Sequence, residues 1–91
     1  MMHTTMENLT AIEWRIVGLY RTQIQPNGSL PILTLKQIVD SGIGSREQIA
    51  SALGRMCENR LLYCAGSVQW TDDNLFFLIG KAAEWAKAPQ A

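Results

Sequence analysis

The sequence predicts an α+β domain that is mostly helical, in which two short helices joined by a tight turn lead into a β-hairpin. Three helical segments each open with a hydroxyl residue followed three positions later by Glu or Gln, a pattern that caps helix amino termini. A glycine-rich break at 42–44 separates the second of these segments from the third. Two β-prone runs, 60–64 and 68–71, flank Gly66 and Ser67, which suit a two-residue hairpin turn.

Length and composition favour a single globular domain over residues 1–91. The chain has 91 residues, of which 47% are hydrophobic and 18% charged, so it can bury a core but has no room for a second domain. The amino-terminal stretch has no leader pattern, and the longest apolar run, LFFLIG, is too short to span a membrane. We therefore expect a cytoplasmic protein that does not enter a membrane.

The first predicted helix spans residues 10–24 and follows a flexible tail at 1–8. Thr10 and Glu13 form its capping box, and apolar residues recur at helical spacing from Ile12 to Tyr20. Glu13 falls largely outside this apolar stripe. The helix ends before Pro26, which cannot continue it.

Two further helices are predicted at 34–41 and 45–59. A short apolar run precedes the first of them, and because Pro31 in that run lacks an N–H, we expect a brief edge strand there. Asn59 is expected to end the longer helix in a left-handed conformation. The capping boxes are Thr34 with Gln37 and Ser45 with Gln48, and the apolar face of the longer helix consists of Ile49, Ala52, Leu53 and Met56.

The hairpin is predicted over 60–71 and a last helix over 73–88. In the hairpin register, Tyr63 faces Trp70 on the side expected to cover the core, and Cys64 points the other way. The last helix has more apolar surface than one stripe can hold, which predicts a dimer or partner interface. The surplus residues are Phe76, Phe77 and Trp85, and the alternative is that they pack against the first helix and bury Trp14.

Two stretches carry a family resemblance. LTAIEWRIVGLY resembles the first helix of MarR-type (multiple antibiotic resistance regulator) repressors, and SREQIASALGRMCENRLL resembles their recognition helix running into a wing strand. The pattern covers roughly residues 9–86 and is shared by the wider winged helix-turn-helix superfamily. The resemblance implies a winged helix-turn-helix with three helices, a β-hairpin wing and an additional C-terminal helix, in which the third helix enters the DNA major groove.

The resemblance also implies which side chains would face DNA. Arg46 and Gln48 would read bases, while Ser45 and Arg55 would hold phosphates; Ser51 lies on the same side. The helix departs from a typical DNA reader because it also carries Glu47 and Glu58. The eight Lys and Arg residues of the chain equal its eight Asp and Glu residues, so one copy is expected to bind DNA weakly and a dimer would double the contacts.

The sequence offers no metal site, cofactor site or catalytic constellation. Cys57 and Cys64 have only His3 to join them, which is too few ligands for zinc. We interpret them as reduced thiols, with a disulfide or a redox sensor as minor alternatives. The only histidine, His3, lies in the predicted tail and is poorly placed to act as a catalytic base. We therefore expect a protein that is not an enzyme.

The leading hypothesis is a small transcriptional regulator that binds double-stranded DNA as a homodimer. The alternative is a winged-helix protein-interaction module, such as an adaptor, a complex subunit or a phage-type inhibitor, with little or no DNA binding. A continuous positive stripe on the surface would favour DNA, and a mixed surface would favour a protein partner.

Overall fold

The computed structural model describes residues 9–88 and has the fold class that the sequence predicts. The order of elements is α1 (Ala11–Thr22), β1 (Leu33–Thr34), α2 (Leu35–Asp40), α3 (Arg46–Glu58), β2 (Leu62–Ala65), β3 (Leu75–Leu78) and α4 (Gly80–Lys87). The strands form one antiparallel sheet in the order β1-β3-β2, so β1 is the short edge strand expected from Pro31. The predicted tail at 1–8, with His3, lies outside the described residues.

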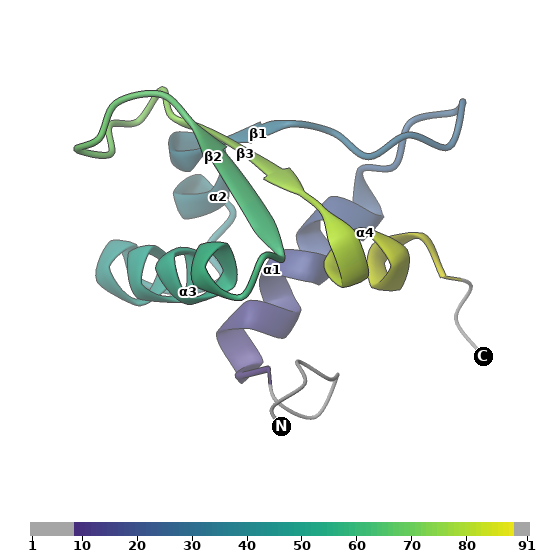
Figure 1. Ribbon diagram of the computed structural model, residues 1–91, viewed down its shortest axis with the longest axis horizontal. Coiled ribbons are helices and arrows are strands. Elements are labelled where there is room, and N and C mark those ends of the chain that lie inside the picture. Colours follow the sequence, from purple (N-terminus) through teal and green to yellow (C-terminus); the bar gives the residue numbers. More distant parts are fainter. Residues whose placement is uncertain (1–8, 89–91) are drawn as a thin grey trace.

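Figure 1 shows the sheet lying over the helices, with α4 at the far end of β3. The core consists of apolar side chains from α1, α2, α3 and the sheet, together with Ala82 and Ala86 of α4. At its centre, the hydroxyl of the buried Tyr20 in α1 donates a 2.6 Å hydrogen bond to the carbonyl oxygen of Phe76 in β3. No helix within residues 9–88 has the length and apolar character needed to cross a bilayer.

All three predicted capping boxes are present. In α1, the Thr10 N–H donates to Glu13 Oε1 at 2.8 Å, and the Glu13 N–H donates back to the Thr10 hydroxyl at 3.3 Å. The same reciprocal pairs open the other two helices, Thr34 with Gln37 in α2 and Ser45 with Gln48 in α3. Each cap stabilises its helix by about 1 kcal/mol, which explains why such short helices begin where they do.

Arg60, rather than Asn59, takes the left-handed conformation after α3. Its φ is +60°, whereas Asn59 has φ −88°. The Arg60 N–H donates to the Cys57 carbonyl at 3.1 Å, and the Leu61 N–H donates to the Met56 carbonyl at 2.8 Å. These two bonds define a Schellman motif, so the predicted stop is wrong by one residue.

The wing differs from its prediction in its second strand. The partner of β2 is Leu75–Leu78, while Val68–Thr71 belongs to the loop 66–74, where Val68 is fully exposed. The predicted helix at 73–88 is correspondingly shortened to Gly80–Lys87. Leu75–Leu78 is β-prone, and as a strand it bonds to both β1 and β2, which a helix at this position could not do.

Because β2 pairs with 75–78 and not with 68–71, the face of β2 that covers the core is the opposite of the predicted one. Leu62 pairs with Leu78 and Cys64 with Phe76, which places these residues toward the core. Tyr63 is 59% exposed, so its predicted place over the core is wrong. Successive strand residues point to opposite faces, so the pairing that turns Tyr63 outward turns Cys64 inward.

A buried asparagine organises the wing loop. Asn74 is 1% exposed, and its side-chain oxygen accepts hydrogen bonds from the Thr71 N–H at 2.9 Å and the Thr71 hydroxyl at 3.1 Å. Its amide donates to the Ser67 carbonyl at 3.1 Å. Gly66 approaches closely, since a Cβ there would lie 2.9 Å from the Asn74 side chain. The side chain thus replaces backbone bonds across the loop and lets Trp70 pack edge-on against Phe76 at 5.1 Å.

Candidate nucleic-acid interface

The five residues predicted to face DNA all lie on the solvent side of α3 or at its start. Ile49, Ala52, Leu53 and Met56 bury the opposite side. We call the exposed side the α3 outer face, and it consists of Ser45, Arg46, Glu47, Gln48, Ser51, Arg55 and Glu58. The structure therefore brings the predicted residues together, along with two glutamates.

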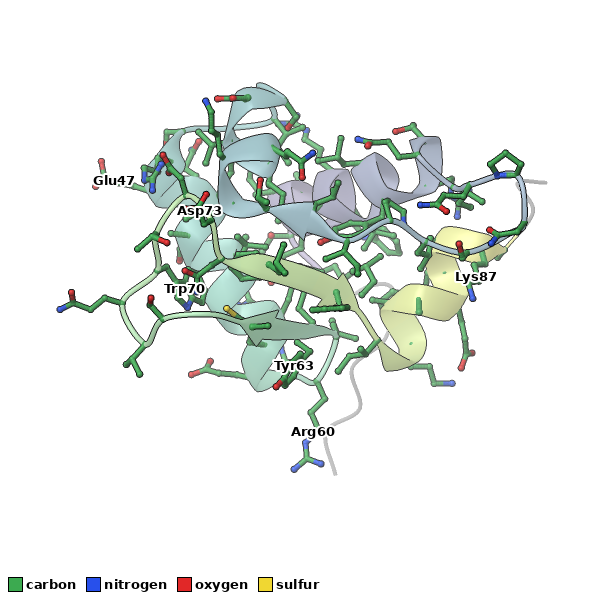
Figure 2. The ribbon with its side chains drawn as sticks, turned by 90° about the horizontal axis from the view of Figure 1, so that it is seen from above. Glu47, Arg60, Tyr63, Trp70, Asp73 and Lys87 are labelled. Atoms are coloured by element: carbon green, nitrogen blue, oxygen red, sulfur yellow. The ribbon has the colours of Figure 1, made fainter. Side chains whose placement is uncertain are left out.

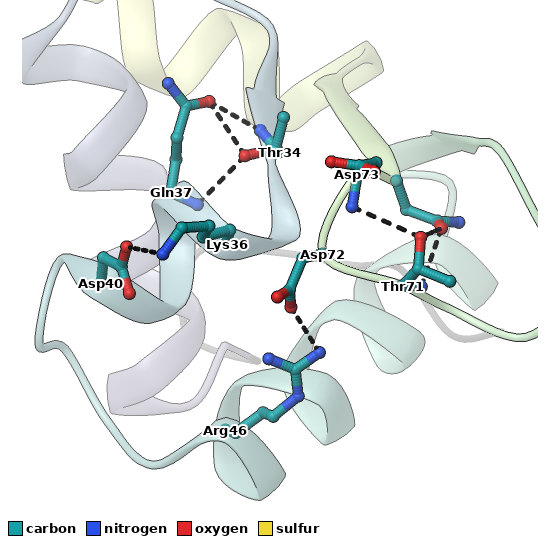
Figure 3. A network of polar contacts seen from close by, with 9 residues as sticks. Thr34, Lys36, Gln37, Asp40, Arg46, Thr71, Asp72 and Asp73 are labelled. Atoms are coloured by element: carbon teal, nitrogen blue, oxygen red, sulfur yellow. Dashed lines mark hydrogen bonds and ion pairs between the residues drawn. The ribbon is translucent and has the colours of Figure 1, made fainter.

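Arg46 forms an ion pair with the wing. Its Nη2 lies 2.8 Å from Asp72 Oδ1, and both side chains are about half exposed, at 51% and 52% (Figure 3). Exposed pairs of this kind contribute about 0–1 kcal/mol, so Arg46 can exchange Asp72 for another anion at little cost. The sequence gives no sign of this pair, because Asp72 lies 26 positions after Arg46 and is brought to it only by the folded wing loop.

The capping box of α3 uses the side-chain oxygen atoms of Gln48 and Ser45. The Gln48 side-chain oxygen accepts from the Ser45 N–H at 2.9 Å, and the Ser45 hydroxyl accepts from the Gln48 N–H at 3.1 Å. The Gln48 NH2 group stays available as a donor. A bidentate contact to adenine also needs the amide oxygen, so it would compete with the cap.

Arg55 is tied to α1 through a buried carboxylate. Its Nε lies 3.5 Å from Glu13 Oε2, and the Glu13 side chain is fully buried. This oxygen has no hydrogen-bond partner among the described residues, whereas Oε1 is bound by the Thr10 N–H. The capping box turns Glu13 back along the helix and under α3, which corrects its predicted place outside the buried stripe. Arg55 offsets a buried charge and is less free than Arg46 to hold a phosphate.

A hollow of about 390 Å³ lies where the start of α1 meets the α3 outer face. Its lining includes side chains from both helices: Thr10, Ile12, Glu47, Gln48, Ser51, Ala52 and Arg55. Ser51 and the free NH2 group of Gln48 face this hollow without tertiary hydrogen bonds in the described part of the chain. The hollow therefore belongs to the same surface as the predicted DNA contacts.

The charge of the helix-turn-helix and wing together is close to neutral. Residues 34–74 contain four cations and five carboxylates, and the wing loop 66–74 contains Asp72 and Asp73 but neither Lys nor Arg. Lys36 is itself paired with Asp40 at 2.9 Å (Figure 3). Three of the four cations, Lys36, Arg46 and Arg55, therefore lie within ion-pair distance of a carboxylate.

The three residues predicted for a dimer interface lie in three different environments. Phe76 is fully buried in the core, so that part of the prediction is wrong. Trp85 packs on Trp14 of α1 with ring centroids 5.5 Å apart, and its carbonyl accepts a hydrogen bond from Arg21, as in the alternative of packing against the first helix. Phe77 lies on the outer face of the sheet beside Tyr63.

The two cysteines are free and half-buried. Burial raises the pKa of the Cys57 thiol above its ordinary value, and the nearby Cys64 raises it further. A raised pKa lowers the thiolate fraction and the reactivity of the thiol at neutral pH. In the range 9–88, no three His, Cys, Asp or Glu side chains cluster closely enough to hold a metal ion.

Comparison with known proteins gives a fold and no family. No protein-family model matches the chain, and no curated protein matches it significantly. Structures of Lactococcus lactis ZitR mutants do match. One aligns with a TM-score of 0.66 at 22% identity, over 96% of this chain and 54% of ZitR. A second mutant, in its apo form, aligns with a TM-score of 0.63 at 26% identity, over 89% and 55%.

A third ZitR mutant gives a TM-score of 0.65 at 22% identity, over 96% of this chain and 53% of ZitR. These likenesses confirm the winged helix-turn-helix fold. The chain spans about half the length of ZitR.

Proposed function

We propose that this protein is a transcriptional regulator that binds double-stranded DNA through the α3 outer face and acts as a homodimer in the cytoplasm, without enzymatic activity. The proposal rests on one observation above all: α3 stands at the surface of a winged helix-turn-helix with Arg46, Gln48, Ser51 and Arg55 directed away from the core. In this fold, the corresponding helix enters the major groove.

The two ion pairs rank the arginines as DNA contacts. Arg46 would give up its ion pair with the half-exposed Asp72 in order to contact a phosphate or a guanine edge, and losing that exposed pair costs little free energy. Arg55 would leave the buried Glu13 without a counter-charge, which is costly. We therefore expect Arg46 to contribute most to affinity and Arg55 to contribute less.

Affinity per copy should be low because the wing loop brings two carboxylates and no cation toward the duplex. Non-specific affinity depends on how many phosphates the protein neutralises, and one copy has few cations to use. Two copies bound on a two-fold site would double the number of contacts.

Fluorescence anisotropy with a mixed-sequence duplex at low salt tests the proposal. We expect binding in the micromolar range and a loss of about fivefold or more for Arg46→Ala, which removes a charge-assisted contact. Lys87→Ala is the matched control, because it removes one cation from α4, far from α3 (Figure 2). If wild type does not bind at tens of micromolar, or if both variants bind equally well, DNA binding by α3 is refuted.

A second candidate function is a protein-interaction module. It is favoured by one specific observation: Glu47 and Asp73 lie at the same end of the molecule (Figure 2), where Asp72 also pairs with Arg46 (Figure 3). A partner with a basic surface would suit this end better than a phosphate backbone does. Absence of duplex binding in the titration above would favour this function over DNA binding.

A further inference from the structure

One face of the sheet carries apolar side chains that no other described element covers. Helices α1, α2 and α3 lie on the inner face (Figure 1), where Leu62, Phe76 and Leu78 are buried. We call the apolar residues of the opposite face the outer sheet patch. It consists of Ile32, Tyr63, Leu75, Phe77 and Ile79, whose exposed fractions are 49% for Ile32, 59% for Tyr63 and 37% for both Leu75 and Ile79, while Phe77 is half-buried.

The strand register makes the patch continuous. Tyr63 pairs with Phe77, and their rings lie 5.9 Å apart across β2 and β3. Leu75 is two residues before Phe77 and Ile79 two residues after it, so alternation along the strand puts all three on one face. Leu33 pairs with the inward-facing Phe76, which places its neighbour Ile32 on the outer side as well. Such contiguous apolar surface usually marks an interaction site.

Charges of opposite sign lie beyond the two ends of these strands. At one end, Arg60 precedes β2 and Lys81 follows β3; the two segments are adjacent, because the Ile79 N–H donates to the Leu61 carbonyl at 3.0 Å. At the other end is the wing loop, where Asp72 pairs with Arg46 and Asp73 remains, and Figure 2 shows Asp73 and Arg60 at opposite sides of the hairpin. Within residues 9–88, Arg60, Lys81 and Asp73 form no ion pair.

We propose that the outer sheet patch binds a second copy of this chain, face to face, about a two-fold axis that lies in the plane between the sheets and runs perpendicular to the strands. That axis reverses the strand direction, so the basic end of each copy meets the acidic end of the other. An axis parallel to the strands would instead place Asp73 against Asp73 and Arg60 against Arg60. Charge complementarity therefore selects the first arrangement.

This inference rests on the homodimer of the proposed function and names its interface, while leaving the α3 outer face exposed on both copies. Five apolar side chains per copy make a small patch by the standards of stable dimers, so we expect a dimer that forms at micromolar concentrations. Its centre is the Tyr63–Phe77 pair, since aromatic residues at the middle of an interface carry most of the binding energy.

Sedimentation equilibrium of the full chain without DNA tests the interface. Protein concentrations from about 5 to 300 µM bracket the dissociation constant expected for a small interface. Wild type should move from monomer to dimer across this range. Tyr63→Glu should remain monomeric, because it places a charge at the centre of the patch. Val68→Glu is the matched control: Val68 is fully exposed in the wing loop outside the patch, and the charge change is identical. Circular dichroism checks that both variants are folded.

Charge reversal tests the orientation. In the proposed dimer Arg60 faces Asp73 of the other copy, so Arg60→Glu should weaken dimerisation about tenfold. The double variant Arg60→Glu with Asp73→Arg should regain most of the loss. A parallel axis predicts no change in either variant. The inference is overturned if wild type stays monomeric at the highest concentration, if Tyr63→Glu dimerises like Val68→Glu, or if the double variant is not rescued. Because no DNA is present, these results are independent of the duplex titration.

Discussion

The buried carboxylate of Glu13 in α1 lies 3.5 Å from the guanidinium Nε of Arg55 in α3, so the first helix holds an arginine of the proposed DNA-binding face. The same carboxylate caps α1 through the Thr10 N–H. Loss of Arg55 leaves a buried negative charge without its counter-ion, whereas a glutamine at position 13 keeps the cap and carries no charge.

Arg55→Ala should therefore be more destabilising in the wild-type background than in a Glu13→Gln background. We expect a cost of about 1–3 kcal/mol in the first case and under about 1 kcal/mol in the second. Urea denaturation of the four members of this double-mutant cycle measures the difference. Equal costs in the two backgrounds would show that the pair does not interact.

Asn74→Ala should lower the free energy of unfolding by about 2 kcal/mol, because it removes the hydrogen bonds to Thr71 and Ser67 that hold the wing loop. Gln69→Ala, at an exposed position of the same loop, serves as the control and should change stability by less than about 0.5 kcal/mol. Thermal denaturation compares the two. Equal midpoints would show that the loop does not depend on Asn74.

Arg60→Gly should raise the free energy of unfolding by about 1 kcal/mol, since glycine takes φ +60° without strain. Asn59→Gly provides a matched test one residue earlier, where φ is −88°. There, glycine gains nothing and should be neutral or destabilising. Urea denaturation at low protein concentration measures the free energy of unfolding of both variants. If Asn59→Gly were more stable than Arg60→Gly, the assignment of Arg60 as the left-handed residue would be contradicted.

Stability should fall at alkaline pH through Tyr20. Burial raises the pKa of its hydroxyl above the ordinary value of about 10, and the nearby Cys57 raises it further. The unfolded chain therefore loses this proton at a lower pH than the folded one, so the contribution is complete below about pH 10 and declines as the pH rises above that value.

Tyr20→Phe tests this by removing the ionisable group and its hydrogen bond to Phe76. At pH 7 it should cost about 1 kcal/mol, and the cost should shrink between about pH 10 and 11.5. Tyr63→Phe, at an exposed site, is the control. A cost for Tyr20→Phe that is constant over this range would contradict the raised pKa.

The first three helices could be predicted from sequence because their start signals are local, whereas α4 begins at Gly80, and not at 73, without a side-chain cap. Each capping box joins residues three positions apart, and all three formed as expected. The wing could be predicted only in part, because strand pairing is set by distant residues. Phe76 and Phe77 suit either a helix or a strand, and the choice depends on β1 and on Asn74, which closes the loop from within.

The α3 outer face was predictable as a set of exposed residues, but the ion partners on it were not. Asp72 and Glu13 reach Arg46 and Arg55 only after the chain has folded, from the wing and from α1. A charged residue inside a capping box gives no sign in the sequence that it will be buried. These pairs explain why the face is less basic than its two arginines suggest.

The salt dependence of duplex binding tests the central claim most directly. Anisotropy titrations of wild type and Arg46→Ala between about 25 and 150 mM salt should give affinities that fall as salt rises, with a log–log slope that is smaller by about one for the variant, because one phosphate-neutralising contact is lost. No binding at the lowest salt, or identical slopes and affinities for the two proteins, would contradict the claim that α3 binds DNA through Arg46.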